Sequence, residues 1–230
     1  MFIKIISLFY ILLFINISVV AQPTFIISTK AQYDSSINAN KKNKLINLKK
    51  LISGLIVDLK YATPNNFTKK KLYKKATTTY LRFDAAHALL AIQQSLNSQG
   101  FALKIFDAYR PYSVTKLMWD LIHDERYVAN PKSGSGHNKG TSVDLTIVET
   151  GLKKELDMGT EFDNFTEQAH HSYTPNFDST IRSNRNLLKS TMEKFGFKSL
   201  ETEWWHYSWN SSEKFDVIDI NFKKLRSLVF

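Results

Sequence analysis

Two short segments carry the side chains best suited to chemistry in this 230-residue chain. The first, Ser135–Asp144, reads Ser-Gly-His-Asn-Lys-Gly-Thr-Ser-Val-Asp, and the second, Glu203–His206, reads Glu-Trp-Trp-His. Together they supply two imidazoles and two carboxylates. A catalytic zinc ion takes three protein ligands of these kinds and leaves a fourth position open for water. The pattern therefore predicts that His137, Asp144 and His206 bind a single Zn²⁺.

A carboxylate beside such a zinc ion would act as a general base. Bound zinc lowers the pKa of its water from about 15.7 to roughly 7, and a neighbouring carboxylate can accept the proton as the water attacks a carbonyl. A peptide bond is the natural target of this chemistry. Glu203 is the acid left over in the second segment, and Glu201 lies close enough in the sequence to be an alternative.

The elements that carry these residues follow from the local sequence. Gly140 allows the chain to turn after the first imidazole, and residues 143–148 form an apolar run that is typical of a buried strand. We therefore expect Asp144 on a rigid strand. Glu203 and His206 are three residues apart, and a regular strand would point them to opposite faces. Because bulges re-aim side chains and the flanking aromatic residues favour strands, we expect a distorted strand here.

Strands and helices alternate irregularly along the rest of the chain. Their periodicity and breakers predict strands at 55–61 and 101–109, helices at 82–98 and 179–194, and a loop at 130–140. Ser113 is the predicted N-cap of one more helix. Its apolar stripe is expected to pack in the core through Val114, Leu117, Met118, Leu121 and Ile122. Without regular βαβ alternation, this mixture favours an α+β fold whose central antiparallel sheet is flanked by helices.

Length and composition suit one folded domain, since 43% of the residues are hydrophobic and 13% are aromatic. We expect this domain to span residues 51–230, after a loosely ordered polar segment at 22–50 in which the one candidate strand is 25–28. Residues 1–21 resemble a secretory signal peptide that is cleaved after Ala21. Their apolar run is shorter than the ~20 residues of a spanning helix, so we expect export to the periplasm or medium and no membrane span after cleavage. An uncleaved anchor is the alternative.

Composition also excludes several kinds of protein. The chain has no cysteine, so it cannot form disulfides, bind zinc through thiolates or use a cysteine nucleophile. The net charge is +10, which would suit an anionic partner. However, the lysine runs at 41–44 and 69–75 contain a single aromatic residue, Tyr73, in place of the spaced series of single-strand binders, and no DNA-reading motif is present. We expect no nucleic-acid partner, and the sequence does not indicate an oligomeric state.

Four further histidines do not complete a better ligand set. His87 and His123 are expected at the surface or in structural positions. His170 and His171 are adjacent and follow the acidic segment 157–163, so a contact with the active-site pocket stays open for them.

The motif Ser-x-His-x-x-Gly-x-x-x-Asp, followed by Glu-x-x-His and preceded by Asp107-Ala-Tyr-Arg-Pro111, resembles the zinc D-Ala-D-Ala metallopeptidases. Two other segments, 58–67 and 157–163, are similar to those of the D-alanyl-D-alanine dipeptidases within that group. The resemblance extends from about Val57 to Trp209 and implies a single domain of the Hedgehog/DD-peptidase type.

This resemblance implies a role for each site residue. It assigns the zinc ion to His137, Asp144 and His206, and it favours Glu203 as the catalytic base over its neighbour. It further implies that Arg110 stabilises the oxyanion, and that the dipeptide substrate is bound near Ser135, Asp163 and Tyr61. The implied reaction is the hydrolysis of D-Ala-D-Ala to two D-alanines in cell-wall peptide turnover.

Two other functions remain open at this point. The first is a D,D-carboxypeptidase or endopeptidase that acts on peptidoglycan stem peptides. The second is an envelope module that keeps zinc for structure, although such sites are closed and need no base. Where many relatives carry Ala, this chain has Ser142, which adds a hydroxyl near the metal strand without removing a ligand.

Overall fold

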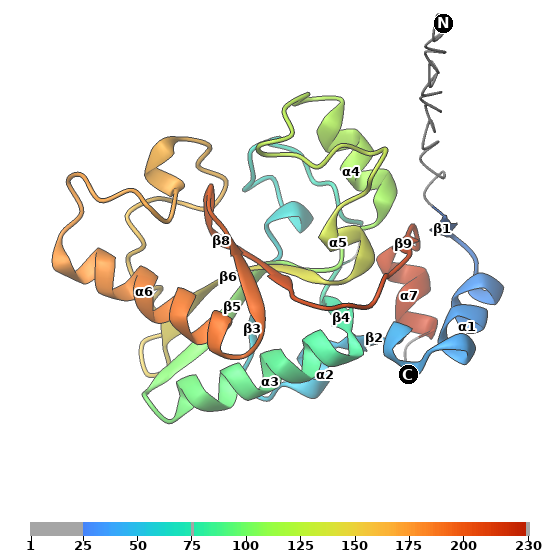
Figure 1. Ribbon diagram of the computed structural model, residues 1–230, viewed down its shortest axis with the longest axis horizontal. Coiled ribbons are helices and arrows are strands. Elements are labelled where there is room, and N and C mark those ends of the chain that lie inside the picture. The colour runs from blue at the N-terminus through green and yellow to red at the C-terminus, as the bar shows by residue number, and fades with distance from the viewer. Residues whose placement is uncertain (1–24, 75, 229–230) are drawn as a thin grey trace, which may run out of the picture.

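A five-stranded sheet forms the centre of the fold in this computed structural model, which describes residues 25–74 and 76–228 (Figure 1). Its strands, in spatial order, are β3 (Ile56–Val57), β5 (Phe101–Asp107), β6 (Ser142–Glu149), β8 (Glu203–Trp209) and β7 (Phe197–Leu200). All neighbours pair antiparallel except β3, which runs parallel to β5 at the edge. The α+β prediction is confirmed, and the parallel edge strand is an addition to it. The predicted signal segment 1–21 lies outside the described residues.

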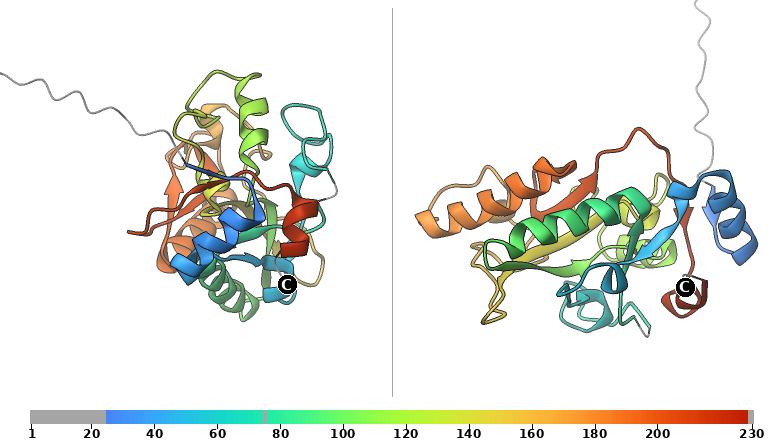
Figure 2. Two further views of the ribbon diagram at one scale, coloured as in Figure 1. Left: turned by 90° about the vertical axis from the view of Figure 1, so that its right-hand side faces the viewer. Right: turned by 90° about the horizontal axis from the view of Figure 1, so that it is seen from below.

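Helices α3 (Phe83–Asn97) and α6 (Ser179–Lys194) cover one face of this sheet (Figures 1 and 2). They confirm the predicted helices to within one residue at each end. The remaining helices are α1 (Lys30–Ala39), α2 (Leu48–Leu51), α4 (Tyr112–Trp119), α5 (Gly136–Lys139) and α7 (Phe222–Leu228), with 3₁₀ turns η1 (Lys41–Asn43), η2 (Lys60–Ala62) and η3 (Glu167–Ala169). In the described part of the chain, no helix combines the length and the apolar character needed to cross a membrane.

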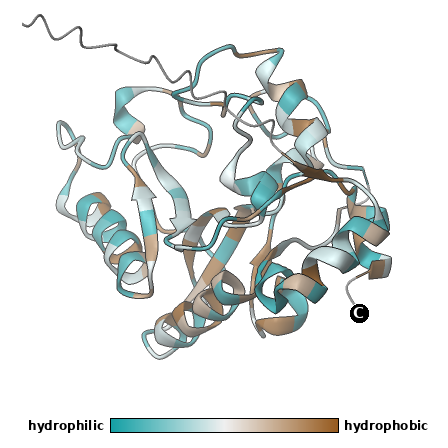
Figure 3. Cartoon of the chain, turned by 45° about the vertical axis from the view of Figure 1, so that its right-hand side comes forward, coloured by the Kyte–Doolittle hydropathy of each residue, from teal (hydrophilic) through white to brown (hydrophobic). Residues whose placement is uncertain are grey.

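Both faces of β6 are buried, but one packs in the apolar core and the other carries polar side chains. Val143, Leu145 and Ile147 belong to the same apolar cluster as buried residues of α3 and α6. Because successive side chains alternate across a strand, Ser142 and Asp144 point to the opposite face. Figure 3 shows the corresponding pattern, with hydrophobic colour concentrated in the central strands and hydrophilic colour in the loops and on the outer sides of helices. The chemistry therefore lies on the face that α3 and α6 leave uncovered.

The N-terminal segment confirms the candidate strand at 25–28 as β1 (Ile26–Ile27) but corrects the rest of the expectation, because it is folded where a loosely ordered lead-in was predicted. Its residues form β1, which pairs with β9 (Val217–Ile218), then α1, and then β2 (Leu45–Asn47), which pairs with β4 (Tyr80–Arg82). The polar composition of this segment does not reveal why it folds. Ile27, Tyr33 and Leu45 are fully buried at wide spacing, and a capping box starts α1 at Thr29. The domain boundary at residue 51 was therefore placed too late.

Helix α4 also differs from its prediction. The helix begins at Tyr112 with Pro111 as N-cap residue, so Ser113 is not the cap. Instead, the side chain of Asp219 accepts hydrogen bonds from both the backbone N–H (3.0 Å) and the hydroxyl (2.7 Å) of Ser113. The predicted stripe is only partly buried, since Leu117 and Leu121 are each 52% exposed. A carboxylate from the far end of the chain thus supplies a cap that local sequence cannot reveal.

Two shorter corrections concern the segments before and after α4. The strand predicted at 55–61 is limited to β3, after which the chain forms the turn η2. The loop predicted at 130–140 contains the one-turn helix α5. Both turns carry a residue that lines the same cavity, Tyr61 in η2 and His137 in α5.

Candidate metal centre and active site

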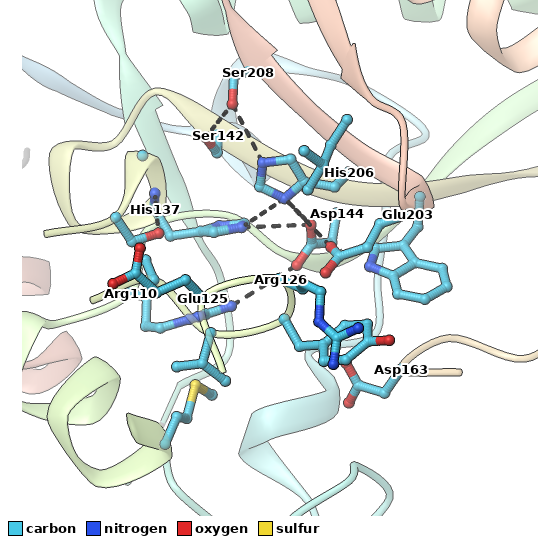
Figure 4. Close-up of a pocket in the computed structure, with 18 of the residues that line it drawn as sticks. Arg110, Glu125, Arg126, His137, Ser142, Asp144, Asp163, Glu203, His206 and Ser208 are labelled. Carbon is cyan, nitrogen blue, oxygen red and sulfur yellow. Dashed lines mark hydrogen bonds and ion pairs between the residues drawn. The ribbon is translucent and has the colours of Figure 1, made fainter. Parts of the chain in front are cut away.

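His137, Asp144 and His206 converge on one point, as the sequence predicts (Figure 4). The atom pairs are His137 Nε2 and His206 Nδ1 at 3.2 Å, His206 Nδ1 and Asp144 Oδ1 at 2.9 Å, and His137 Nε2 and Asp144 Oδ1 at 3.4 Å. Ligands of a tetrahedral zinc ion with bonds of about 2.0–2.1 Å are separated by about 3.3 Å. The donor set and its spacing therefore fit a zinc ion.

Sheet register brings two of these donors together. Asp144 on β6 pairs directly with His206 on β8, so the two side chains stand next to each other on the same face. His137 comes from α5, which ends at Gly140 with a left-handed φ of 71°. A residue with a side chain would be strained in that conformation, so the glycine allows the tight return from the helix into β6.

The short helix α5 is held by its own capping residues. The Ser135 hydroxyl accepts from the His137 backbone N–H (3.2 Å), and the Asn138 side chain accepts from the Ser135 N–H (2.9 Å). Asn138 is fully buried and also donates to the Arg110 carbonyl (2.9 Å). Ser135, predicted to lie near the substrate, therefore lines the cavity and caps α5 at the same time. Asn138 was missed, although its place three residues after Ser135 is a capping-box signal.

The ring orientation of His137 leaves Nε2 available to a metal. Its Nδ1–H donates to the Ala108 carbonyl at 2.7 Å, and a carbonyl can only accept, so the ring proton is fixed on Nδ1. Such a second contact orients metal-binding histidines in general. Burial would raise the pKa of Asp144, but the two imidazoles beside it hold that pKa well below its usual range. The carboxylate is thus kept in the ionised form that binds a cation.

Glu203 faces the same centre because β8 is irregular. β7 pairs Ser199 with Tyr207 and then Leu200 with Glu203, so three intervening β8 residues have no partner on β7. This bulge turns Glu203 Oε2 to 3.9 Å from His206 Nδ1, which confirms the distorted strand. Burial raises the pKa of Glu203 to about 8. Glu201, the alternative, points elsewhere and accepts from the Ser172 N–H at 2.8 Å.

Arg110 enters the site beside the metal ligands. Its Nε and one terminal nitrogen donate to Asp107 Oδ2 at 2.9 and 2.8 Å, and the guanidinium lies 3.8 Å from Asp144 Oδ2. Asp107 is fully buried and accepts a further hydrogen bond from the Tyr73 hydroxyl at 2.7 Å. A bulge between Ile105 and Asp107 places this carboxylate opposite Asp144. Asp107 is the first residue of the motif Asp107-Ala-Tyr-Arg-Pro111, but no role was predicted for it from the sequence.

Asp163 and Tyr61 form the far wall of the site. The Tyr61 hydroxyl donates to Asp163 Oδ1 (2.9 Å), and the Phe67 N–H donates to Asp163 Oδ2 (3.2 Å). Asp163 has a left-handed φ of 61°, and burial raises its pKa to about 7. The Arg110 guanidinium lies over the Tyr61 ring at 5.0 Å. The structure thus places all the predicted site residues around one space.

That space is a cavity of about 200 Å³, and the predicted metal ligands are part of its lining (Figure 4). Apolar and aromatic side chains wall it, among them Phe67, Met118, Phe165 and Trp205. Arg126 and Glu125 border it from the loop after α4. The volume suits a small molecule that carries a few charged groups.

The remaining histidines lie away from this centre. His87 and His123 are exposed, as predicted. His171 is half-buried with no hydrogen-bond partner on Nε2, and burial lowers its pKa to about 4. Neither His170 nor His171 belongs to the cavity lining, so the open contact with the pocket is not made.

Comparison with known proteins identifies the family of this chain. The family model of the D-Ala-D-Ala dipeptidases, peptidase M15, matches residues 41–224. A D-alanyl-D-alanine dipeptidase of Escherichia coli (strain K12) is 33% identical over 179 residues, which cover 78% of this chain and 91% of that protein. The dipeptidase of Enterococcus faecalis (strain ATCC 700802 / V583) is 31% identical and covers 72% of this chain and 91% of its own. Among solved structures, the LdcB LD-carboxypeptidase shares 22% identity over 61% of this chain and 64% of its own, with a TM-score of 0.40. The chain belongs to the D-Ala-D-Ala dipeptidase family of M15 peptidases.

Proposed function

We propose that this protein hydrolyses the dipeptide D-Ala-D-Ala to two D-alanines with one zinc ion as cofactor. The observation that carries the proposal is the convergence of His137, Asp144 and His206 beside a separate buried acid, Glu203, in one small cavity. Three donors with a further, non-ligating acid are the arrangement of a hydrolytic zinc site, whereas a structural site needs a fourth protein ligand. The family relationship and the named activity of the relatives support the same reaction.

His137 Nε2, Asp144 Oδ1 and His206 Nδ1 would hold the zinc ion. When bound, zinc supplies an acidified water and polarises the scissile carbonyl. Glu203 accepts the proton of the attacking water and returns it to the amine that leaves. The buried position of this carboxyl suits both steps, since a pKa above the usual range allows the group to give the proton back.

Arg110 would stabilise the negative charge that develops on the carbonyl oxygen. Asp107 binds Nε and one terminal nitrogen of the guanidinium, and that same terminal nitrogen lies 3.8 Å from Asp144 Oδ2, so the donor is held beside the proposed metal position. Holding the donor in place before the reaction is what makes such stabilisation effective. Asp107 is thus a positioning residue that acts through Arg110.

Substitution of Arg110 by Lys should lower kcat by about 10²–10³-fold, because one preorganised donor to the oxyanion is lost. The matched control is Arg126→Lys, since Arg126 also borders the cavity but is 70% exposed in its side chain and pairs with Asp124. We expect the control to keep most of its turnover. Steady-state kinetics on zinc-loaded protein measures both, and equal losses of kcat in the two variants would contradict the role of Arg110.

Asp163 and Tyr61 would bind the free amine of the dipeptide. Asp163 is a buried acid in the cavity lining, and an ammonium group placed there would compensate its buried charge. The Tyr61 hydroxyl and the Phe67 N–H fix the carboxylate in place. Ser135 keeps its hydroxyl proton for donation into the cavity while its oxygen caps α5. A requirement for a free amine would explain a preference for dipeptides.

This assignment predicts a pH dependence. Burial raises the pKa of Asp163 to about 7, so kcat/KM for D-Ala-D-Ala should rise as pH increases through 7 and the ionised form becomes available to the ammonium. Asp163→Asn should lower kcat/KM by roughly 10–100-fold, the size of one charged hydrogen bond, and should remove this limb of the profile. The control is Glu161→Gln, which lies outside the cavity lining. An unchanged limb in Asp163→Asn would assign it to another group.

The test of the proposed function compares two substrates. Purified zinc-loaded protein is incubated with D-Ala-D-Ala and with a stem pentapeptide, each with and without a chelator, and released D-alanine is measured. We expect chelator-sensitive release from the dipeptide only. Faster release from the pentapeptide would establish a carboxypeptidase instead, and absence of release from both would leave a zinc-binding module.

We further propose that the reaction takes place outside the cytoplasm, as part of cell-wall peptide turnover. The support is the signal-like composition of residues 1–21. N-terminal sequencing of the protein from its native host should show cleavage after Ala21. A mature chain that begins at Met1 would count against this placement.

A further inference from the structure

Two serine hydroxyls lie directly behind His206, on the side away from the other metal donors (Figure 4). Ser208 Oγ is 3.2 Å from His206 Nε2, and Ser142 Oγ is 2.7 Å from Ser208 Oγ. Ser142 and Ser208 are directly opposite each other on β6 and β8, two pairs along from Asp144 and His206. The ligand pair and the serine pair therefore share one face of the sheet.

The hydroxyls match the protonation that His206 needs as a ligand. Its Nδ1 faces His137 and Asp144, so a metal at their common point would take the Nδ1 lone pair, and the ring proton must then be on Nε2. Ser208 Oγ can accept a hydrogen bond from that Nε2–H. Its own hydroxyl can then donate a hydrogen bond to Ser142 Oγ. Both hydroxyls are thereby satisfied with the imidazole in its metal-binding tautomer.

His206 needs such a restraint more than His137 does. The ring of His137 is fixed by a backbone carbonyl, whereas His206 lies in the bulged stretch of β8 that has no partner on β7. The glycine at position 136 also leaves space for the Ser142 hydroxyl. Ser142 is fully buried, and a Cβ on Gly136 would lie 2.0 Å from its hydroxyl oxygen, so only glycine leaves room for it.

We propose that Ser208 and Ser142 are positioning residues that fix the orientation and tautomer of His206 for zinc binding. The inference rests on the proposed metal site. Groups behind a metal ligand typically contribute 10–100-fold to metal affinity. We therefore expect Ser208→Ala to weaken zinc binding by about 10–100-fold, and Ser142→Ala to weaken it less, since water or Ser208 alone can still satisfy Nε2.

The first measurement is the zinc dissociation constant, from competition with a chromophoric chelator. Ser208→Thr keeps the hydroxyl and should restore most of the affinity lost in Ser208→Ala. The matched control is Ser199→Ala, on the neighbouring strand β7, whose hydroxyl donates to Glu193 and makes no contact with the site. An affinity in Ser208→Ala equal to that of the control would overturn the proposal.

The second measurement reads the ring itself. In ¹H–¹⁵N NMR spectra of the zinc-loaded protein, the Nε2–H of His206 should exchange slowly with water in the wild type, because it donates to Ser208, and should shift and exchange faster in Ser208→Ala. Unchanged signals would overturn the proposal even if zinc affinity fell through a general loss of stability. If the wild type neither binds zinc nor hydrolyses the dipeptide, the proposed function fails. If it does both and Ser208→Ala behaves like the wild type, the serine pair alone is rejected.

Discussion

Substitution of Glu203 by Gln should lower kcat for D-Ala-D-Ala by about 10²–10⁴-fold, the range that a positioned general base contributes. Gln has nearly the same shape but cannot accept the proton of the attacking water. Glu203 Oε2 lies 3.9 Å from His206 Nδ1 and is not one of the converging donors, so zinc content should stay at that of the wild type. Turnover and metal analysis on the same preparation measure both quantities.

The matched control is Glu201→Gln, which removes an acid two residues away. Glu201 accepts from the Ser172 N–H and does not border the cavity, so this variant should keep its turnover. Near-normal turnover in Glu203→Gln, or a large loss in Glu201→Gln, would reject the assignment of the base.

A stability measurement separates the catalytic role from a folding defect. Burial raises the pKa of Glu203 from 4.5 to about 8, so folding favours the protonated form, and the stability that this form gives is lost as pH rises from about 4.5 through 8. A neutral Gln side chain does not ionise, so the variant does not lose stability in this way as pH rises. The zinc-free Glu203→Gln protein should therefore melt at a higher temperature than the zinc-free wild type at pH 8, while its zinc-loaded form shows the large loss of kcat.

The metal donors could be predicted from sequence because the residue types and spacing that identify them are local, although sheet register is what brings Asp144 and His206 together. An apolar run fixes Asp144 on a buried strand, and the spacing from Glu203 to His206 demands a bulge wherever both must face one site. Glycine at 140 permits the turn that separates His137 from that strand. These features depend on residues within a few positions of each other.

The supporting residues could not be predicted, because their roles depend on contacts far apart in the sequence. Asp107 faces the site only through a bulge in β5, and Tyr73, which donates to it, comes from a distant loop. Asp219 caps α4 from the far end of the chain. The N-terminal strands bury Ile27 and Leu45 against partners that occur much later, so their polar neighbours suggested disorder. Local pattern identifies donors, whereas register and packing determine what surrounds them.

Substitution of His137 by Ala should abolish both zinc binding and hydrolysis. A catalytic zinc site has three protein ligands. Without His137, only His206 and Asp144 remain beside each other, and two ligands do not complete the site. Dialysis of the wild type against a chelator should have the same effect on turnover, and added zinc should restore it only in the wild type. The control is His123→Ala, an exposed histidine on the loop after α4.

Thermal unfolding gives this prediction a readout that does not depend on catalysis. A ligand that binds only the folded state stabilises it by roughly 4 kcal/mol when its concentration is about 1,000 times its Kd. Zinc should therefore raise the Tm of the wild type and of His123→Ala, but not that of His137→Ala. Because His137 is buried in α5 and its Nδ1–H donates to Ala108, the variant also loses a contact that ties α5 to the residue directly after β5. Its zinc-free Tm should fall, so the response to zinc, and not the absolute Tm, decides whether the three side chains form the metal centre.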